Sequence, residues 1–344
     1  MQKIVAHINF AKGFRGGERQ TLLLIEALAA TGMHQKLLVR KNSSLTERLK
    51  ETKNLTIIEI SKPYIFSIKE IKDATLIHAH ETKALQFAYF AHVISGIPYI
   101  VTRRVDNKIK NNFLNKKLYN SASRVVALSY AIKKEILKVT PNARVDIIPS
   151  AFTGTSTNQN NIKNIKKRFE NKFIIGHVGA LDDKHKGQSF LISAAKLLEK
   201  TYPNIHFIFV GGGADEKILK SQAKELQNIT FEGFVNNVND YISCFDIFVF
   251  PSRNEGLGSI LFDVMQLNVP IIASNVGGIP DIIHHKKNGF LVPPCDHTAI
   301  TEAILLLYKN EDLRVSFALS AKDNIDKYSI ENMKKSYLDI YSCI

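Results

Sequence analysis

The chain has 344 residues, of which 45% are hydrophobic, and 46 Lys and Arg against 32 Asp and Glu give a formal net charge of +14. This length predicts two domains, and the apolar content excludes a disordered chain. The excess charge lies in residues 1–150, which contain 25 Lys and Arg against 11 Asp and Glu, whereas the remainder contains 21 of each. Such asymmetry indicates either a basic soluble surface or an anionic partner: nucleic acid, a membrane surface or a phosphorylated substrate.

The cysteines and the hydropathy of the sequence restrict the class of protein further. Cys244, Cys295 and Cys343 lack C-x-x-C spacing and predict neither a disulfide framework nor a zinc site. The apolar run in residues 1–10 is too short and too interrupted for a signal peptide. No apolar stretch reaches the roughly 18–20 residues that span a bilayer, so we expect a cytoplasmic protein.

The first half alternates short apolar strands with amphipathic helices. The predicted strands are Ile4–Ile8, Leu37–Arg40, Thr56–Ile60, Leu76–His78, Pro98–Thr102, Arg124–Leu128 and Val145–Ile148. The predicted helices are Thr21–Ala30, Lys83–Ser95 and Tyr130–Val139. This alternation predicts βαβ units and a parallel sheet, which makes residues 1–152 a Rossmann-like domain.

A polar, Asn-rich segment, 153–172, is interpreted as a linker with a short helix near its end. The alternation then restarts, which predicts a second doubly wound α/β domain over residues 173–325. Its predicted strands are Phe173–Val178, His206–Val210, Thr230–Glu232, Asp246–Phe250 and Pro270–Ala273. Its predicted helices are Gln188–Lys200, Glu216–Leu226, Val238–Cys244, Ser259–Gln266, Thr298–Lys309 and Leu313–Ile325. A last helix in residues 326–344, over Glu331–Tyr341, is expected to pack back toward the first domain.

Ligands of such sheets bind beyond the carboxyl ends of the strands, so two domains facing across a cleft predict a ligand between them. Glycines follow several strands: Gly16 and Gly17 open the first helix, and Gly211–Gly213 follow the strand that ends at Val210. A glycine turn at a helix N-terminus suits an anion, although each is equally an ordinary βα turn. Lys184 and Lys186 precede another helix and could meet a phosphate or remain solvated. Neither half contains a dinucleotide fingerprint or a P-loop.

The segment from Pro251 to Asp263 has the highest density of candidate residues. Glu255 is predicted in a loop and Asp263 about one turn into the following helix, whose first N–H groups, at Ser259 and Ile260, suit a phosphate oxygen. A carboxylate here could accept hydrogen bonds from a vicinal diol, or could be a capping or surface acid. The turn from Gly277 to Asp281 forms another strand–Gly-Gly–helix junction at the same cleft.

Two polar pairs end strands of the first half. His78 and His80 share one strand face, but without a visible third ligand we predict no metal. Arg103 and Arg104 follow a strand and suit an anionic substrate, with a plain surface charge run as the alternative.

At this level of detail the chain resembles the retaining glycosyltransferases of family four. The resemblance rests on Glu255–Asp263, Asn268–Ser274, Gly277–Ile283 and Asn288–Val292, supported by Gly16–Glu18, Leu76–His80, Ala127–Ser129, Gly179–Gly187, Val210–Gly213 and Phe231–Phe234. It covers nearly the whole chain. It implies the GT-B fold, in which two Rossmann-like domains hold a nucleotide-sugar between them.

The resemblance also implies roles for individual residues. Glu255 would contact the transferred sugar, Asp263 the ribose, and Lys186 the diphosphate. The wider donor-binding set that it implies is Gly16, Gly17, Lys184, Gly213, Phe234, Gly256, Leu257, Gly258, Ser259 and Ile260. His80, Arg103 and Arg104 become the acceptor-side candidates. The resemblance implies a front-face substitution in which charge stabilisation replaces a protein nucleophile, with no metal or cofactor required.

Three positions depart from the family pattern. Asp263 stands where a Glu is usual, and Gly179-Ala180 replaces a Gly-Arg pair, so Lys184 is a candidate substitute for the missing cation. Arg104 stands where many relatives have His.

The leading hypothesis is therefore a retaining hexosyltransferase. It would move a sugar from a nucleotide-sugar, with UDP favoured, to an envelope glycolipid or polysaccharide such as lipopolysaccharide core. The basic first half would suit an anionic acceptor and peripheral contact with the cytoplasmic face of the inner membrane. A nucleotide-sugar 2-epimerase of the same fold is the alternative enzyme. A non-catalytic nucleic-acid-binding protein is the third hypothesis, but no recognised module supports it, and we predict no nucleic-acid partner.

Overall fold

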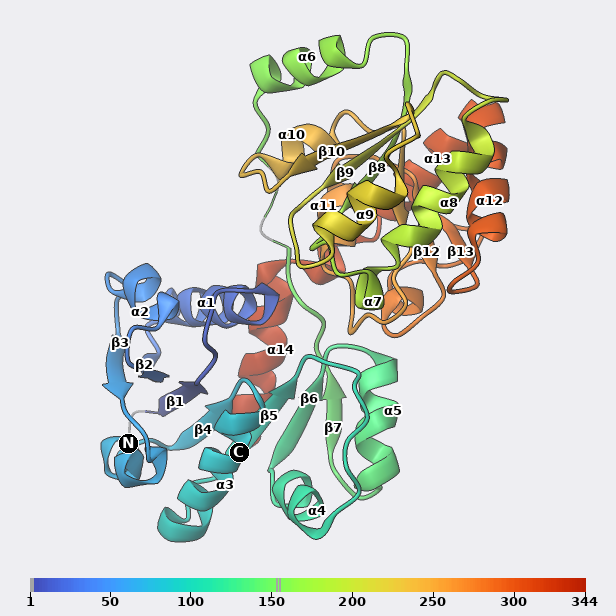
Figure 1. The fold of residues 1–344 in the computed structure, drawn as a ribbon. Helices are drawn as coiled ribbons and strands as arrows, with labels where there is room; N and C mark the ends of the chain where they lie inside the picture. Colours follow the sequence, from blue (N-terminus) through green and yellow to red (C-terminus); the bar gives the residue numbers. More distant parts are fainter. Residues whose placement is uncertain (1–2, 153, 155) are drawn as a thin grey trace. The chain divides into compact units, whose positions relative to one another are not determined.

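The computed structural model describes residues 3–152, 154 and 156–344 (Figure 1). It divides into two compact units, each described by itself: unit 1 comprises Met1–Ala151 with Tyr328–Ile344, and unit 2 comprises Phe152–Lys327. Residues 1 and 2 of the expected first domain, and 153 and 155 of the expected linker, lie outside the described residues. Among the described helices, none is both long and apolar enough to cross a membrane.

Unit 1 is built on a seven-stranded parallel sheet in the order β3-β2-β1-β4-β5-β6-β7. Its strands are β1 (Ile4–Asn9), β2 (His34–Arg40), β3 (Leu55–Ile60), β4 (Leu76–Ala79), β5 (Tyr99–Arg103), β6 (Arg124–Ala127) and β7 (Val145–Ile147). The order reverses between β1 and β4, which is where such sheets bind ligands. The predicted parallel α/β sheet is therefore confirmed.

Helices connect these strands and cover the sheet. They are α1 (Gly16–Ala29), α2 (Ser44–Leu49), the 3-10 helix η1 (Tyr64–Ile71), α3 (Thr82–Ser95), α4 (Phe113–Asn120) and α5 (Tyr130–Val139). Local sequence sets their ends: the Glu81 side chain caps α3 by accepting from the N–H of Ala84 at 2.8 Å, and Gly96 ends that helix in the left-handed conformation.

The C-terminal helix α14 (Ile330–Ser342) belongs to unit 1 and packs on α1. Tyr337 and Tyr341 of α14 are buried in one core cluster with Leu24 and Leu28 of α1 and with Ile100 of the sheet. Burial of large side chains on both sides of this contact makes α14 part of the unit 1 core.

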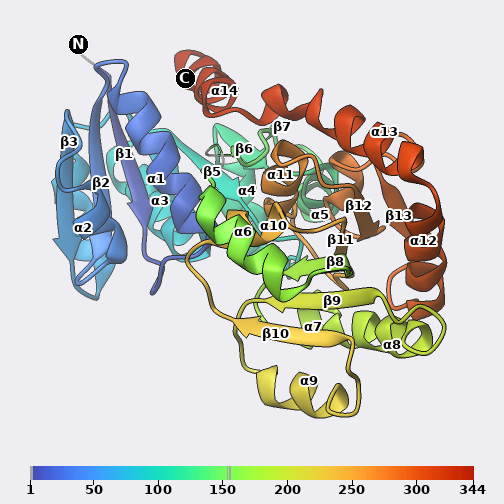
Figure 2. The ribbon, with the colours of Figure 1, turned by 90° about the horizontal axis from the view of Figure 1, so that it is seen from above.

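Unit 2 is built on a six-stranded parallel sheet in the order β10-β9-β8-β11-β12-β13. Its strands are β8 (Phe173–Val178), β9 (Ile205–Val210), β10 (Ile229–Gly233), β11 (Ile247–Phe250), β12 (Ile271–Ser274) and β13 (Phe290–Val292). Figure 2 shows β8, β9 and β10 side by side. The order reverses between β8 and β11, so this sheet repeats the doubly wound pattern of the first.

The helices of unit 2 are α6 (Gln159–Arg168), α7 (Asp183–Lys186), α8 (Gln188–Leu198), α9 (Glu216–Gln222), α10 (Val238–Ile242), α11 (Ile260–Gln266), η2 (Ile279–Asp281), α12 (His297–Lys309), α13 (Glu311–Lys322) and η3 (Ile325–Tyr328), whose last residue falls in unit 1. Helix α6 lies in the segment predicted as a linker and packs on α10. Phe207, Phe209 and Leu191 are fully buried in the main core of the unit.

Several short elements were not predicted. They are α2, η1, α4, α7, β13 and η3, which have between three and eight residues each. Segments of this length contain one or two periods of a helical pattern, which is too little for periodicity to separate them from loops.

Candidate functional site

An ion pair occupies the carboxyl ends of the two central strands of unit 2. Lys186 follows β8 and Glu255 follows β11, and the Lys186 Nζ lies 2.5 Å from a Glu255 carboxylate oxygen. The Lys186 ammonium also lies 5.1 Å from the centre of the Phe250 ring, within the range of a cation–π contact. Because β8 and β11 flank the reversal of strand order, the pair lies where doubly wound sheets bind ligands.

The turn that carries Lys186 is held close to the end of β11. Gly187 ends this turn with a φ of +65°, and a Cβ there would lie 2.3 Å from the Pro251 carbonyl oxygen. A side chain at this position would therefore be strained and would push the two loops apart. The backbone N–H of Arg253 also donates to the His185 carbonyl at 2.9 Å, which joins the loops directly.

Arg253 and Asp183 form a second link between the two loops. The Arg253 Nη2 lies 2.8 Å from an Asp183 carboxylate oxygen, and its Nε donates to the Asp183 carbonyl at 3.0 Å. The same carboxylate accepts from the N–H and hydroxyl of Ser189 at the start of α8. The guanidinium stacks 4.4 Å from the Phe190 ring centre. This cluster fixes the turn that holds Lys186 against the loop that holds Glu255.

A neutral histidine lies below the ion pair in the core. His177 is fully buried, and its Nδ1 lies 3.0 Å from the Val249 carbonyl, so Nδ1 carries the proton. Its Nε2 then accepts from the Gln188 amide at 3.4 Å. Burial lowers the pKa of His177 to about 4, and the charge of Lys186 acts in the same direction.

Other predicted donor residues surround these loops, and two glycines among them allow close approach. A Cβ at Gly213 would lie 2.3 Å from the Leu181 carbonyl oxygen, and Gly258 has a φ of +85° and lies close to Phe250. Ser259 precedes α11, with Ile260 as its first residue, and Asp263 is half-buried within the helix. Gly256 and Leu257 lie in the loop between Glu255 and Gly258, with Leu257 buried.

Two donor candidates of unit 2 lie on its surface. Lys184 is exposed in α7, and the Phe234 ring is 82% exposed beyond the end of β10, near Gly212. The remaining donor candidates, Gly16 and Gly17, belong to unit 1. The structure thus brings Lys186 and Glu255 into direct contact and distributes the other donor candidates over both units.

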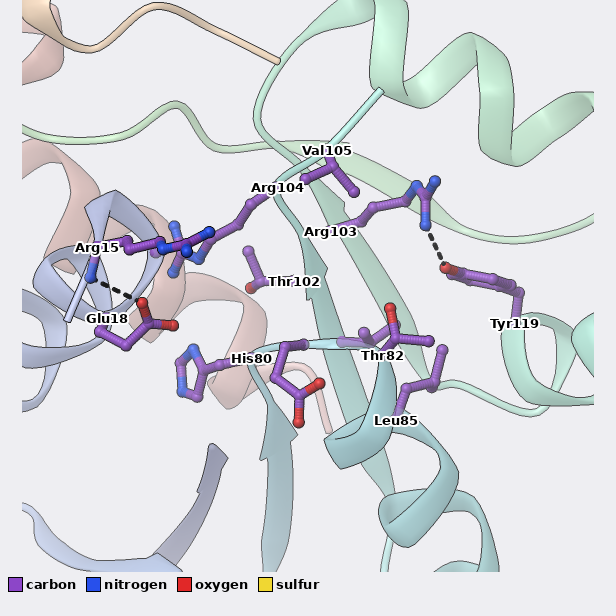
Figure 3. A pocket seen from close by; sticks show the side chains of 13 residues that line it. Arg15, Glu18, His80, Thr82, Leu85, Thr102, Arg103, Arg104, Val105 and Tyr119 are labelled. Atoms are coloured by element: carbon purple, nitrogen blue, oxygen red, sulfur yellow. Dashed lines mark hydrogen bonds between the residues drawn. The ribbon is translucent and has the colours of Figure 1, made fainter. Parts of the chain in front are cut away.

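Unit 1 has a cavity of about 370 Å³ at its own reversal of strand order, beyond β1, β4 and β5. Figure 3 shows side chains that line it, and the lining includes His80, Arg103 and Arg104 together with Gly17 of the α1 N-terminus. This volume is within the range of small-molecule sites. The three acceptor-side candidates are therefore brought together in one cavity.

The two carboxylates of the cavity are engaged by backbone groups. Glu18 accepts from the N–H of Arg15 at 2.9 Å, and Glu81 accepts from the N–H groups of Lys83 and Ala84 at the start of α3. Both acids therefore cap helices, and they do not form ion pairs with the arginines of the cavity among the described residues.

Arg103 and Arg104 of the cavity retain unused hydrogen-bond donors. Arg103 donates to the Tyr119 hydroxyl at 3.1 Å, while its Nε is buried without a partner. Arg104 extends toward the α1 N-terminus, 3.3 Å from where a Gly17 Cβ would be, and its guanidinium has no hydrogen-bond partner among the described residues (Figure 3). The Nδ1 of the buried His80 is also unpartnered, but it is an acceptor. The His7 Nε2 donates to the Gln35 amide oxygen, so the His7 Nδ1 accepts from the His80 Nε2, which carries the proton of His80. The unpaired buried donors of Arg103 and Arg104 favour an anionic ligand.

Beside this cavity, His80 belongs to a buried cluster with His7 and His78. His7, the third histidine of the cluster, was not predicted from the sequence. In-register pairing of β1 with β4 places His7 opposite His78. The His7 Nδ1 lies 3.0 Å from the His80 Nε2, and its Nε2 lies 3.0 Å from the Gln35 amide oxygen. Burial lowers the pKa of His7 to about 4 and that of His78 and His80 well below the usual value. The cluster forms a neutral hydrogen-bonded network, and the predicted absence of a metal stays a prediction.

Comparison with known proteins identifies the family. The sequence model described as "Glycosyl transferases group 1" matches residues 158–324, and the model described as "Glycosyltransferase Family 4" matches residues 14–152. The chain belongs to glycosyltransferase family four. The resemblance recognised from the sequence motifs is thereby confirmed, as is the GT-B fold.

The sequence relatives of the chain are distant. The chain is 29% identical over 184 residues to an uncharacterized glycosyltransferase of Haemophilus influenzae, which covers 52% of this chain and 51% of the relative. It is 25% identical over 300 residues to the D-inositol 3-phosphate glycosyltransferase of Corynebacterium urealyticum, covering 77% and 70%. The chain thus spans about half the length of the first of these two relatives.

Two solved structures share the whole fold of the chain. Anabaena Alr3699/HepE in complex with UDP superimposes with a TM-score of 0.87 over 100% of both chains, at 18% identity. The lipopolysaccharide outer core galactosyltransferase WaaB superimposes with a TM-score of 0.77 over 100% of both chains, at 16% identity. At these identities the likeness establishes the fold of the chain.

Arg253 and Asp183 were not among the residues predicted for the site. Arg253 lies two positions before Glu255 in the segment that was singled out, so its position was a usable signal. Its partner could not be inferred, because Asp183 is 70 positions away in another loop.

Proposed function

We propose that this chain is a retaining glycosyltransferase that moves a hexose from a nucleotide-sugar to an anionic envelope glycolipid or polysaccharide. The observation that carries the proposal is the Lys186–Glu255 pair at the reversal point of the unit 2 sheet, 2.5 Å apart. A cation and a carboxylate in contact at this place match the two chemistries of a sugar diphosphate, an anionic leaving group and a hydroxylated ring.

In the proposed reaction Lys186 stabilises negative charge on the departing diphosphate, and Glu255 accepts hydrogen bonds from the sugar hydroxyls. The bond between the anomeric carbon and the diphosphate oxygen breaks as an acceptor oxygen bonds to that carbon on the same face. The acceptor proton passes to the leaving diphosphate oxygen. Gly213, Gly256, Leu257 and Gly258 provide close backbone approach for the donor, and no metal or cofactor is required.

The proposed donor is a UDP-sugar. The name of the structural relative Anabaena Alr3699/HepE describes complexes with UDP and with UDP-glucose, and this relative shares the fold over nearly the whole chain. The exposed Phe234 ring would border the base, and Asp263, half-buried in α11, would accept from the ribose.

Transfer from labelled UDP-sugars to extracted envelope glycolipid tests the proposal. The expected result is a labelled glycolipid with the anomeric configuration of the donor, as determined by NMR. Conversion of the nucleotide-sugar to an epimer without an acceptor would contradict the proposal and favour a 2-epimerase.

The proposed acceptor bears a phosphate or carboxylate that enters the unit 1 cavity. The support is the pair of unpartnered buried donors on Arg103 and Arg104, since an anion would satisfy them. Lipopolysaccharide core fits this chemistry, and WaaB, a structural relative, is named for transfer to the outer core.

A matched pair of acceptors tests this assignment. With a phosphorylated oligosaccharide, Arg104→Gln should raise the acceptor KM roughly tenfold, and with its dephosphorylated counterpart the KM should change little. Equal effects on both acceptors would contradict an anion-binding role for Arg104.

We further propose that the protein works at the cytoplasmic face of the inner membrane as a peripheral protein. The support is the basic first half of the sequence, because anionic lipid surfaces attract clustered Lys and Arg.

A further inference from the structure

A groove of about 480 Å³ lies on the surface of unit 1 between η1 and α3, and it shares no lining residue with the cavity described above. Its lining is Lys62, Pro63, Tyr64, Ile65, Lys83, Gln86, Phe87 and Phe90. The floor is aromatic, because the Tyr64 ring stacks 4.1 Å from that of Phe10, and Phe87 packs edge-on against Phe10 at 5.7 Å. The groove is therefore a preformed apolar surface.

Large apolar side chains extend this surface on both sides of the groove. Phe66 of η1 is 74% exposed, and Phe90, Val93 and Ile94 of α3 are 42%, 62% and 64% exposed. The three α3 residues recur at helical spacing with Lys83 and Gln86, so they form one solvent-facing stripe of the helix. Exposed apolar residues gathered in this way indicate an interaction surface.

Two unpaired cations lie at the same groove. Lys62 and Lys83 line it, and within the described part of the chain neither ammonium forms an ion pair or hydrogen bond. Of the described lining residues none is acidic. A second copy of this surface would place lysine against lysine, so charge disfavours self-association through it. An anionic partner with an apolar interior complements both features.

We propose that the groove between η1 and α3, with Phe66, Phe90, Val93 and Ile94 around it, docks on a bilayer that contains anionic lipids. The aromatic and aliphatic side chains enter the interface between headgroups and acyl chains, and Lys62 and Lys83 bind headgroup phosphates. This proposal rests on the membrane location in the proposed function and assigns it to particular residues.

Co-sedimentation of the full chain with vesicles tests the surface. We expect binding to vesicles of phosphatidylcholine mixed with phosphatidylglycerol, and little binding to phosphatidylcholine alone. Lys62→Glu/Lys83→Glu should weaken binding by more than about tenfold, because each lysine near an anionic surface contributes about fivefold. Phe66→Ser/Phe90→Ser should weaken it by roughly tenfold or more through the loss of apolar contact.

The matched control is Val315→Ser/Leu319→Ser on α13 of unit 2, where the side chains are 51% and 53% exposed. This control should bind vesicles like the wild type. Equal binding by the Phe variant and the wild type, or equal loss in the control, would overturn the proposal. The proposal would also be overturned if the wild type were a dimer and Phe66→Ser/Phe90→Ser made it a monomer without changing vesicle binding.

A thermal shift with UDP separates this inference from the proposed function. The Lys and Phe variants should keep the wild-type shift, which shows that they are folded and that docking is independent of donor binding. A wild type that binds vesicles but shows no UDP shift would count against the transferase and leave the docking surface standing. A UDP shift without vesicle binding would overturn the docking surface alone.

Discussion

The Lys186 ammonium and a Glu255 carboxylate oxygen lie 2.5 Å apart, although the residues are separated by 69 positions in the sequence. Each follows one of the two strands that flank the reversal of the unit 2 sheet. Both side chains are partly shielded from solvent, with 24% and 17% of their surfaces exposed. The contact therefore holds a potential phosphate-binding cation and a sugar-binding carboxylate in one place.

Removing either member of this pair should abolish most transfer. We expect Lys186→Ala and Glu255→Ala each to lower kcat by about 10²–10³-fold, because each removes a group that stabilises charge or holds the sugar in the transition state. Transfer of labelled sugar checks this, with circular dichroism to confirm the fold. The exposed pair Lys224 and Glu225, 3.8 Å apart, is the control, and its alanine variants should retain wild-type rates. Normal turnover by Lys186→Ala or Glu255→Ala would remove these residues from the mechanism.

Arg253 should act as a positioning residue for that pair. Arg253→Lys keeps the charge but loses the forked contacts with the carboxylate and carbonyl of Asp183, so the turn that carries Lys186 gains freedom. We expect kcat to fall roughly tenfold with little change in the donor KM, because the defect lies in orientation. Asp183→Asn should produce the same pattern. An unchanged kcat in both variants would show that the link is only structural.

His177 should make unit 2 less stable in acid. Its pKa is lowered to about 4 by burial, so the folded state keeps it neutral while the unfolded chain binds a proton below about 6.5. The contribution of neutral His177 to the free energy of unfolding is fully present above pH 6.5 and is lost as the pH falls toward 4. The loss at pH 5 is roughly 2 kcal/mol. Urea unfolding at pH 7.5 and pH 5 should show that the free energy of unfolding falls less between these two pH values in His177→Asn than in the wild type. The Asn amide can still donate to the Val249 carbonyl. An identical decrease in the free energy of unfolding in variant and wild type would contradict this assignment.

Tyr341 should anchor α14 to the sheet of unit 1. Its hydroxyl lies 2.7 Å from the Nδ1 of His78, whose Nε2 lies 2.8 Å from the Thr102 hydroxyl. Tyr341→Phe leaves a buried imidazole nitrogen unsatisfied, and we expect a loss of about 1–3 kcal/mol in the free energy of unfolding. Tyr89→Phe is the control, because among the described residues the Tyr89 hydroxyl makes no hydrogen bond, and it should change stability by less than about 0.5 kcal/mol. Equal effects would exclude the anchoring role.

Alternating apolar strands and helices were enough to predict both parallel sheets. The strand ends that carry Gly17, Lys186 and Glu255 were located for the same reason, because the carboxyl ends of parallel strands carry the binding loops. Periodicity could not predict that Lys186 touches Glu255. Strand order decides which loops lie next to each other, and the pattern of apolar residues in the sequence does not reveal strand order.

Contacts that depend on register or on a single rotamer were missed. His7 was not joined with His78 and His80, because its place opposite His78 requires β1 to pair with β4 on one side as well as with β2 on the other. The contact between Arg253 and Asp183 was missed for a similar reason, since each residue alone has the pattern of a solvated surface charge. Phe66 and Phe90 are exposed in the structure, but from the sequence alone they could equally belong to a buried apolar stripe.

The most direct test of the central claim, that unit 2 holds a sugar diphosphate with Lys186, is a thermal melt with UDP in wild type and in Lys186→Ala. At about 100 times its Kd, UDP should stabilise the wild-type native state by about 2.7 kcal/mol and raise the Tm of unit 2 by several degrees. The Lys186→Ala protein, at the same UDP concentration, should show a clearly smaller rise. The absence of a rise in the wild type with UDP, GDP and ADP, or equal rises in wild type and variant, would contradict the claim.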